Sequence, residues 1–159
     1  MFVICNIKYV IRNRKAYKYW IFIILMTSIE EHKKNFEQFM ADINEKIRAD
    51  LLLDRQKIIA FDASEAATNL LEYFLHKKNA IPAGFQTNHN YFSSDKIAER
   101  YFDFGFPKKT EIISLMVNQE KLRNLLCYGK EKELAKIKEV IDNLNKIKEI
   151  INKELGENL

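Results

Sequence analysis

The chain has 159 residues, of which 47% are hydrophobic and 30% charged, a balance typical of one soluble globular domain. Only four glycines and two prolines are present, which disfavours a turn-rich β architecture, because turns with special backbone angles depend on these residues. The formal net charge is +4, but residues 1–25 contain five basic residues and no acid, so the rest of the chain carries −1. A body that is nearly neutral disfavours strong, bulk-charge binding of nucleic acid.

The first 25 residues differ from the rest of the sequence. A basic stretch precedes seven apolar residues, Trp20 to Met26, which are too few to span a bilayer and lack a convincing signal-peptide cleavage site. Three interpretations remain: a membrane-surface anchor, an added strand or helix, or an extension absent from the native product. We favour the last, because Ser28 and Glu31 have capping-box spacing and a chain starting at Met26 opens directly on a helix.

Residues 26–159 are therefore expected to form the domain. Apolar residues recur at helical spacing from Ile29 to Leu51, and again through residues 58–75, where Asp54 is positioned to cap the second helix. The alanine-rich segment 61–70 predicts close approach of a neighbouring helix, because small side chains shorten the distance between helix axes.

The second half of the domain contains one long loop and three further helices. The loop covers residues 77–92, and a short helix follows from Asp95 to about Phe104. Thr110 is positioned to cap a helix that ends at a glycine, and residues 131–155 carry one apolar stripe typical of a bundle helix. The sequence therefore predicts an all-α, up-and-down bundle of about five helices.

Cofactor and metal motifs are not recognised in the sequence. Cys5 and Cys127 have neither a disulfide pattern nor metal-ligand spacing, and no glycine-rich phosphate loop is visible. We expect a reduced, cytoplasmic protein that uses no metal and no cofactor.

Three histidines and one pair of carboxylates are candidates for chemistry. His32 lies in a first helical turn and is expected to face solvent, whereas His76 lies at a helix end, where a base suits the helix dipole. His89 lies in the loop and is the best functional candidate, because loops present side chains to ligands. Asp62 and Glu65 are three residues apart on one helix, where they form either a paired-carboxylate site or a solvated helix edge.

The segment KLRNLLCYGK, residues 121–130, contains the remaining candidates. Asn124 and Tyr128 are four residues apart on one helix face, and Gly129 ends the helix, so that Arg123 and Tyr128 can converge. A guanidinium suits phosphate, and tyrosine offers a hydroxyl group and a ring for stacking. The alternative is a basic residue near a helix C-terminus followed by an aromatic staple.

This segment resembles the signature of the HEPN superfamily, in which an arginine, often followed by asparagine, precedes a histidine by four to six residues. Arg123, Asn124 and Gly129 match one common version, and Tyr128 stands where the histidine is expected. The order of helices over roughly residues 30–150 is similar as well. The resemblance implies a small helical bundle that dimerises with its signature residues at or near the subunit interface. It also implies that Arg123 holds a scissile phosphate and that Asn124 orients the site.

Many members of that superfamily are metal-independent ribonucleases, often toxins paired with a nucleotidyltransferase-like antitoxin, and others are binding modules that have lost catalysis. Tyrosine at position 128 departs from the pattern, because an ordinary tyrosine pKa is about 10 and an ordinary histidine pKa about 6.5. We expect a dimer that binds RNA or a nucleotide-bearing partner, with weak or lost catalysis. The alternatives are an active ribonuclease toxin that uses Arg123 with Tyr128 or His89, and an adaptor bundle whose last helix binds a partner.

Overall fold

A computed structural model describes residues 28–82 and 84–159. These residues form five α-helices and one short 3-10 helix, and no strand occurs among them, which confirms the prediction of an all-α bundle. The elements are α3 (Ile29–Arg48), α4 (Gln56–Lys77), η1 (His89–Phe92), α5 (Asp95–Tyr101), α6 (Lys109–Cys127) and α7 (Leu134–Leu155).

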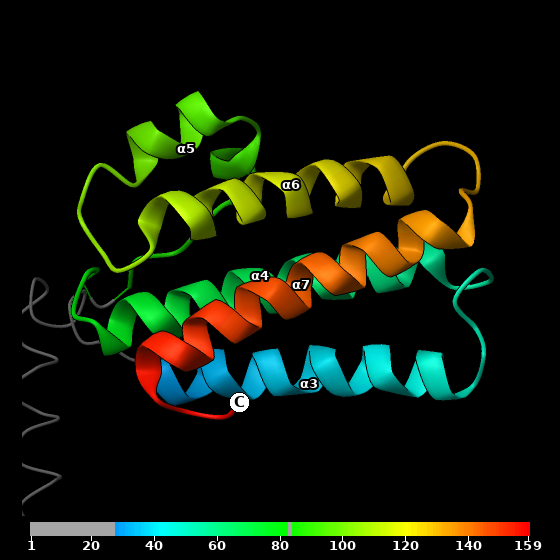
Figure 1. The fold of residues 1–159 in the computed structure, drawn as a ribbon, viewed down its shortest axis with the longest axis horizontal. Coiled ribbons are helices and arrows are strands. Elements are labelled where there is room, and N and C mark those ends of the chain that lie inside the picture. The colour runs from blue at the N-terminus through cyan, green and yellow to red at the C-terminus, as the bar shows by residue number, and fades with distance from the viewer. Residues whose placement is uncertain (1–27, 83) are drawn as a thin grey trace, which may run out of the picture.

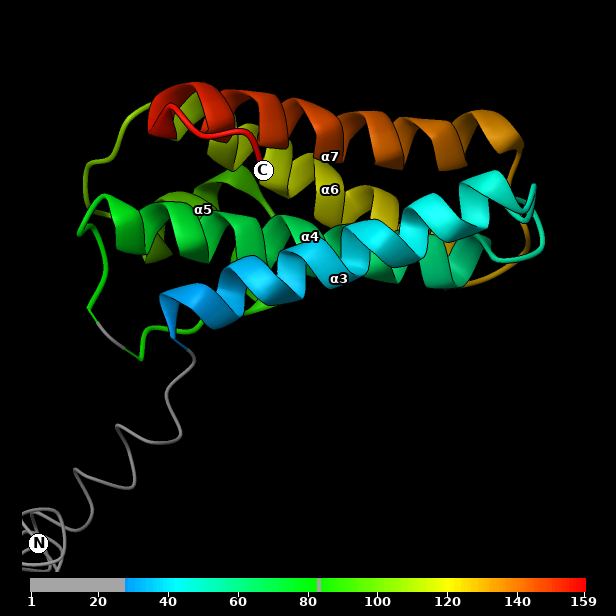
Figure 2. The ribbon, with the colours of Figure 1, turned by 90° about the horizontal axis from the view of Figure 1, so that it is seen from below.

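The four long helices alternate in direction along the chain, and α4 lies between α3 and α6 (Figures 1 and 2). Helix α4 packs against α3, α6 and α7, and α6 also packs against α7. The short elements η1 and α5 contact α6, and α5 lies on the side of α6 that faces away from α3 (Figure 1). The long helices are thus an up-and-down bundle, and η1 and α5 form an excursion between its second and third members.

The alanines of α4 allow its neighbours to pack closely. Ala60, Ala63, Ala66 and Ala67 are completely buried, as the alanine-rich segment predicts. The apolar stripe of α7 is buried in the same core, with Ile137 and Leu144 fully covered. That stripe therefore belongs to the bundle itself, which is the interpretation that the sequence favours for a helix of this length.

The ends of the helices follow the sequence predictions only in part. The Ser28 hydroxyl oxygen accepts a hydrogen bond from the Glu31 backbone N–H at 3.1 Å, which confirms the predicted start of α3. The prediction of Asp54 and Thr110 as caps is wrong. Arg55 is the N-cap of α4 and Lys108, at a φ of 58°, is the N-cap of α6, and neither side chain forms a capping hydrogen bond. Helix α6 ends at Cys127, and Gly129 follows the extended C-cap Tyr128 with the left-handed φ of 84° expected of a glycine at a helix end.

The expectations for the first 25 residues, including the choice of Met26 as the start, fall outside the described residues. Within the ranges that the structure describes, no helix is both long enough and apolar enough to cross a bilayer.

Candidate functional site

A hydrogen-bonded group of polar side chains joins three elements of the fold. Its members come from α4, η1 and α6, and we call them the His89 network: Ser64, Glu65, His89, Glu120, Arg123 and Asn124. Two of its members, Ser64 and Glu120, are buried, and Glu65, His89 and Arg123 are half-buried. The network therefore lies at the edge of the bundle, where its outer members meet solvent.

His89 lies between two carboxylates. Its Nε2 is 2.7 Å from Oε1 of Glu65, and its Nδ1 is 3.1 Å from Oε2 of Glu120. The Ser64 hydroxyl group donates a hydrogen bond to Oε2 of Glu120 at 3.4 Å, and its oxygen lies 3.3 Å from the same Nδ1 of His89. Because both ring nitrogens face a carboxylate oxygen, both act as donors only when the imidazole carries its second proton.

The other oxygen of Glu120 binds the two signature residues on its own helix. Oε1 accepts hydrogen bonds from Nη1 of Arg123 at 2.9 Å and from Nδ2 of Asn124 at 3.1 Å. Arg123 Nη1 also donates to Oδ1 of Asn124 at 3.3 Å. Glu120 therefore fixes the Arg123 and Asn124 side chains relative to each other and connects both of them to His89.

The charges of the network reinforce one another. Hydrogen bonds to Glu120 and Glu65 raise the pKa of His89 from 6.5 to about 9, so the imidazole is a cation at neutral pH. Burial alone raises the pKa of Glu120, but the hydrogen bond from His89 and the nearby Arg123 guanidinium outweigh burial and hold this pKa below its usual value. At neutral pH the network thus contains two cations and two carboxylates.

The segment before His89 is tied to the bundle on both sides of the histidine. The backbone N–H of Thr87 donates to the Glu72 carboxylate on α4, and Asn88 accepts from the Asn90 backbone N–H at 2.9 Å, which starts η1. After the histidine, the ring of Phe92 is buried and stacks on that of Phe102, with 5.4 Å between the ring centroids. These anchors hold His89 between α4 and α6.

The structure separates the predicted catalytic residues into two places. Arg123 and Asn124 lie together, and His89, the predicted substitute acid or base, reaches them through Glu120. Tyr128 follows the end of α6 in extended conformation, its residue is 64% exposed, and no hydrogen bond between described residues involves it. No hydrogen bond between described residues therefore joins Tyr128 to Arg123, although the two side chains were expected to converge.

Asp62 and Glu65 do not form a paired-carboxylate site, and Asp62 is not part of a solvated edge. Asp62 is buried and lies 3.3 Å from the Lys46 ammonium nitrogen on α3, whereas Glu65 binds His89. Burial raises the pKa of Asp62, although Lys46 acts in the opposite direction. The two carboxylates therefore have different partners, Lys46 on α3 and His89 in η1.

A second polar group contradicts the expectation that His32 faces solvent. His32 is buried, and its Nδ1 lies 3.0 Å from the Glu72 carboxylate and 3.3 Å from Oδ1 of Asn69. Its ring stacks on that of His76 at 5.6 Å between centroids. Burial acts to lower the pKa of His32, but the interactions with Glu72 and Asn69 outweigh burial, so the pKa of His32 is raised. For His76, burial and the nearby charge of His32 both lower the pKa.

Two surface hollows adjoin α4. One is a shallow hollow between α3 and α4 that is open to solvent, has a volume of about 570 Å³, and shares Glu65 with the His89 network. Its lining residues are Asn35, Gln38, Phe39, Ala41, Asp42, Glu65 and Asn69.

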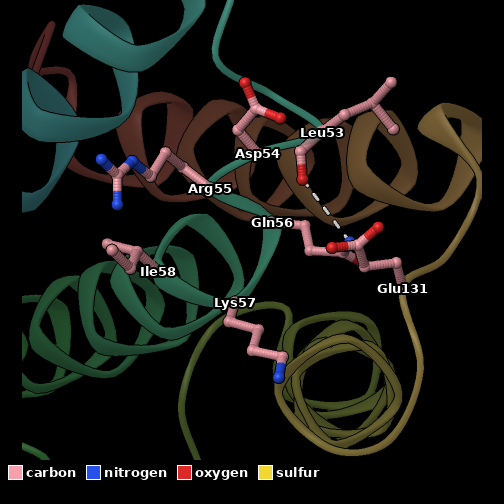
Figure 3. A pocket seen from close by; sticks show the side chains of 7 residues that line it. All are labelled: Leu53, Asp54, Arg55, Gln56, Lys57, Ile58 and Glu131. Atoms are coloured by element: carbon pink, nitrogen blue, oxygen red, sulfur yellow. Dashed lines mark hydrogen bonds between the residues drawn. The ribbon is translucent and has the colours of Figure 1, made fainter.

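The other hollow lies at the start of α4 and is shown in Figure 3. Its lining residues are Leu53, Asp54, Arg55, Gln56, Lys57, Ile58 and Glu131. The Gln56 side chain spans it, because Nε2 donates to the Leu53 carbonyl oxygen at 3.5 Å and Oε1 accepts from the Lys132 backbone N–H at 2.9 Å. This hollow contains no member of the His89 network.

Glu120 and Ser64 were not predicted from the sequence as members of the site. Glu120 carried a signal, because it lies three and four residues before Arg123 and Asn124 and so shares their helix face. Ser64 carried none, since its partners lie on other elements. The described residues contain no group of three or more histidine, cysteine, aspartate or glutamate side chains arranged to hold a metal ion.

Comparisons of the chain with protein-family models, with curated proteins and with solved structures find no match.

Proposed function

We propose that this protein is a HEPN-like helical dimer that binds RNA or a nucleotide-bearing partner through Arg123 and Asn124, with weak or lost catalysis. The observation that carries the proposal is the shared oxygen of Glu120, which holds Arg123 and Asn124 as one ordered pair. An ordered guanidinium beside a carboxamide presents several N–H donors to a phosphate group, and little side-chain entropy is lost when the phosphate binds.

The charge balance of the network supports modest affinity. Glu120 already neutralises part of the charge of Arg123 and His89, so an incoming phosphate has to compete with a carboxylate for the same donors. The body of the chain carries no excess positive charge that would compensate. Binding through one or two phosphates fits these charges better than binding along an extended nucleic-acid backbone.

The state of His89 supports weak catalysis. With a pKa of about 9, the imidazole is protonated at neutral pH and has no free lone pair with which to accept a proton. Tyr128, in the place of the usual histidine, is exposed and forms no hydrogen bond to the network among the described residues. Among the residues that the structure describes, neither of the predicted bases, His89 and Tyr128, is therefore placed and charged to accept a proton beside Arg123.

The surface around Arg123 supports the dimer. Three exposed apolar side chains lie near this end of the two helices: Ile58 and Phe61 at the start of α4, and Tyr128 just after α6. Ser64 contacts Glu120, and the Cys127 thiol donates to the Lys57 carbonyl oxygen at 3.4 Å, so the two helices run side by side along this surface. We propose that a second copy of the chain covers these side chains and brings the two Arg123 residues near one interface.

A second candidate is an active metal-independent ribonuclease, with or without a nucleotidyltransferase-like antitoxin as its partner. The observation that favours it is the 2.7 Å contact between the His89 cation and the Glu65 carboxylate. In this mechanism Glu65 accepts the proton of a 2′-hydroxyl group, whose oxygen attacks the adjacent phosphorus. His89 then gives its proton to the departing 5′-oxygen, Arg123 stabilises the phosphate charge, and a 2′,3′-cyclic phosphate forms.

One assay separates the two candidates. Labelled single-stranded RNA is incubated with the full chain in EDTA and analysed on native and denaturing gels, beside Arg123→Ala, His89→Gln and Tyr128→Phe. The first proposal predicts a shifted but uncut RNA and a weaker shift for Arg123→Ala. Cleavage that is lost in both Arg123→Ala and His89→Gln supports the ribonuclease. Absence of both shift and cleavage contradicts the ribonuclease and RNA binding, and leaves a nucleotide-bearing partner as the remaining form of the first proposal.

A further inference from the structure

The hollow between α3 and α4 has a lining suited to a nucleobase. It contains three carboxamides, two carboxylates and one aromatic ring, and no lysine or arginine is among the described residues that line it. Carboxylates repel phosphate, whereas carboxamides and carboxylates pair with the edges of bases, and an aromatic ring supports their faces. His89 lies outside the lining and binds the lining residue Glu65 at 2.7 Å.

Two of the lining side chains are available for a ligand. Hydrogen bonds between described residues use neither the Gln38 carboxamide nor the Asp42 carboxylate, and both residues are exposed. They are four residues apart on α3, so their side chains lie about 6 Å apart on one helix face. By contrast, Asn69 already binds His32, Asn35 and the Glu65 carbonyl oxygen, which makes it a fixed part of the wall.

We infer that this hollow binds a guanine base, with Asp42 and Gln38 as the residues that select it. Guanine presents two N–H donors, at N1 and at the exocyclic N2, side by side with the acceptor O6. One carboxylate accepts from both donors, and a carboxamide N–H four residues away donates to O6. Uracil places carbonyl oxygens on both sides of its single N–H, and adenine and cytosine each offer one amino group.

This inference rests on the proposed function, and it names the substrate class of the same site. A guanine in the hollow, against Phe39, directs its attached phosphate past Glu65 toward His89 and Arg123, which are joined through Glu120. The base and the phosphate are thereby held by different parts of one continuous surface. Recognition of a base edge requires an unpaired base, so the preferred RNA is single-stranded.

The test compares three short single-stranded RNAs that differ at one central position, which is guanine, hypoxanthine or uracil in an otherwise all-uracil oligomer. Hypoxanthine lacks the exocyclic amino group of guanine and is otherwise the same base. Fluorescence anisotropy gives a Kd for each RNA with the full chain. We expect the guanine RNA to bind about tenfold more tightly than the uracil RNA, and the hypoxanthine RNA to lie between them.

Three variants assign the preference to the hollow. Asp42→Asn should reduce the guanine preference to about twofold or less, because a carboxamide cannot accept two parallel N–H bonds. Asp54→Asn is the matched control, since Asp54 is an exposed aspartate that lines the separate hollow of Figure 3, and it should leave the preference unchanged. Arg123→Ala should weaken all three RNAs by a similar factor.

The outcomes distinguish this inference from the proposed function. Arg123-dependent binding with equal affinity for the three RNAs, or a guanine preference that survives Asp42→Asn, overturns the guanine site and leaves the proposed function intact. If none of the RNAs binds, titration with guanosine monophosphate followed by NMR decides. Binding that depends on Asp42 then supports the hollow and contradicts RNA binding, and no binding overturns both.

Discussion

Arg123 and His89 bind opposite oxygens of one carboxylate, that of Glu120. Nη1 of Arg123 lies 2.9 Å from Oε1, and Nδ1 of His89 lies 3.1 Å from Oε2. The arginine comes from α6 and the histidine from η1, and only the folded bundle brings them to the same residue. Because Arg123 and His89 share one carboxylate, the charge of each cation affects the other. This coupling has measurable consequences for stability and for binding.

The His89 network should make stability depend on pH in the alkaline range. The pKa of His89 rises from 6.5 to about 9 on folding, so the folded state binds its proton more tightly than the unfolded state. The resulting stabilisation, about 3 kcal/mol, is fully present below about pH 6.5 and is lost as the pH rises through about 9.

Urea unfolding of the wild type and of His89→Gln, measured from about pH 6 to 10, tests this dependence. The difference in free energy of unfolding between the two proteins should shrink steadily as the pH increases. A difference that stays constant over the whole range contradicts the raised pKa of His89.

Removing the charge of Glu120 should destabilise the fold strongly. Glu120→Gln leaves two cations, Arg123 and His89, without the carboxylate that they share in a largely buried position, and loss of a buried ionic partner costs about 3 kcal/mol. The matched control is Glu139→Gln, which breaks an exposed ion pair with Lys136 and should cost less than about 0.5 kcal/mol. Equal losses in thermal or urea unfolding would show that the network does not stabilise the fold.

The alanines of α4 should not tolerate enlargement. Ala63 is completely buried between packed helices, so Ala63→Leu has no space for three additional carbon atoms and should cost about 1–3 kcal/mol or more. Ala135→Leu, on the exposed side of α7, is the control and should change the free energy of unfolding by less than about 0.5 kcal/mol. Similar effects at the two positions would contradict the close packing around α4.

The glycine after α6 should be required for its backbone angle alone. Gly129 has a φ of 84°, and an added Cβ would meet no atom within 4 Å, so Gly129→Ala should cost about 1 kcal/mol through backbone strain. Gly105 has equally open surroundings without a positive φ, and Gly105→Ala should be close to neutral in the same unfolding experiment. A neutral Gly129→Ala contradicts the left-handed conformation.

The long helices were predictable because each has an apolar face, and burial of that face determines where the helix packs. The first residue of a helix is harder to predict, because several nearby side chains suit a cap. Asp54 and Thr110 have suitable chemistry, but the chain enters α4 and α6 through Arg55 and Lys108 instead. Ser28 was predicted correctly because the position of Glu31 supplied a second, independent signal.

The candidate site was predictable only residue by residue. Arg123, Asn124 and His89 were identified from local patterns, but their connection runs through Glu120 and depends on the return of η1 to the bundle, which is a tertiary contact. His32 was misjudged for a similar reason. Its position in the first turn of α3 argued for solvent, whereas packing against α4 buries it beside Glu72.

The affinity of the full chain for a short single-stranded RNA tests the central claim most directly. Measured by fluorescence anisotropy at low salt, Arg123→Ala should weaken binding by at least about fivefold, because it removes the donor that is held ready by Glu120. The control, Arg100→Ala, removes an exposed arginine of α5 outside the network and should change the Kd by less than about twofold. Equal Kd values for the wild type and Arg123→Ala would contradict the claim that the His89 network is the binding site.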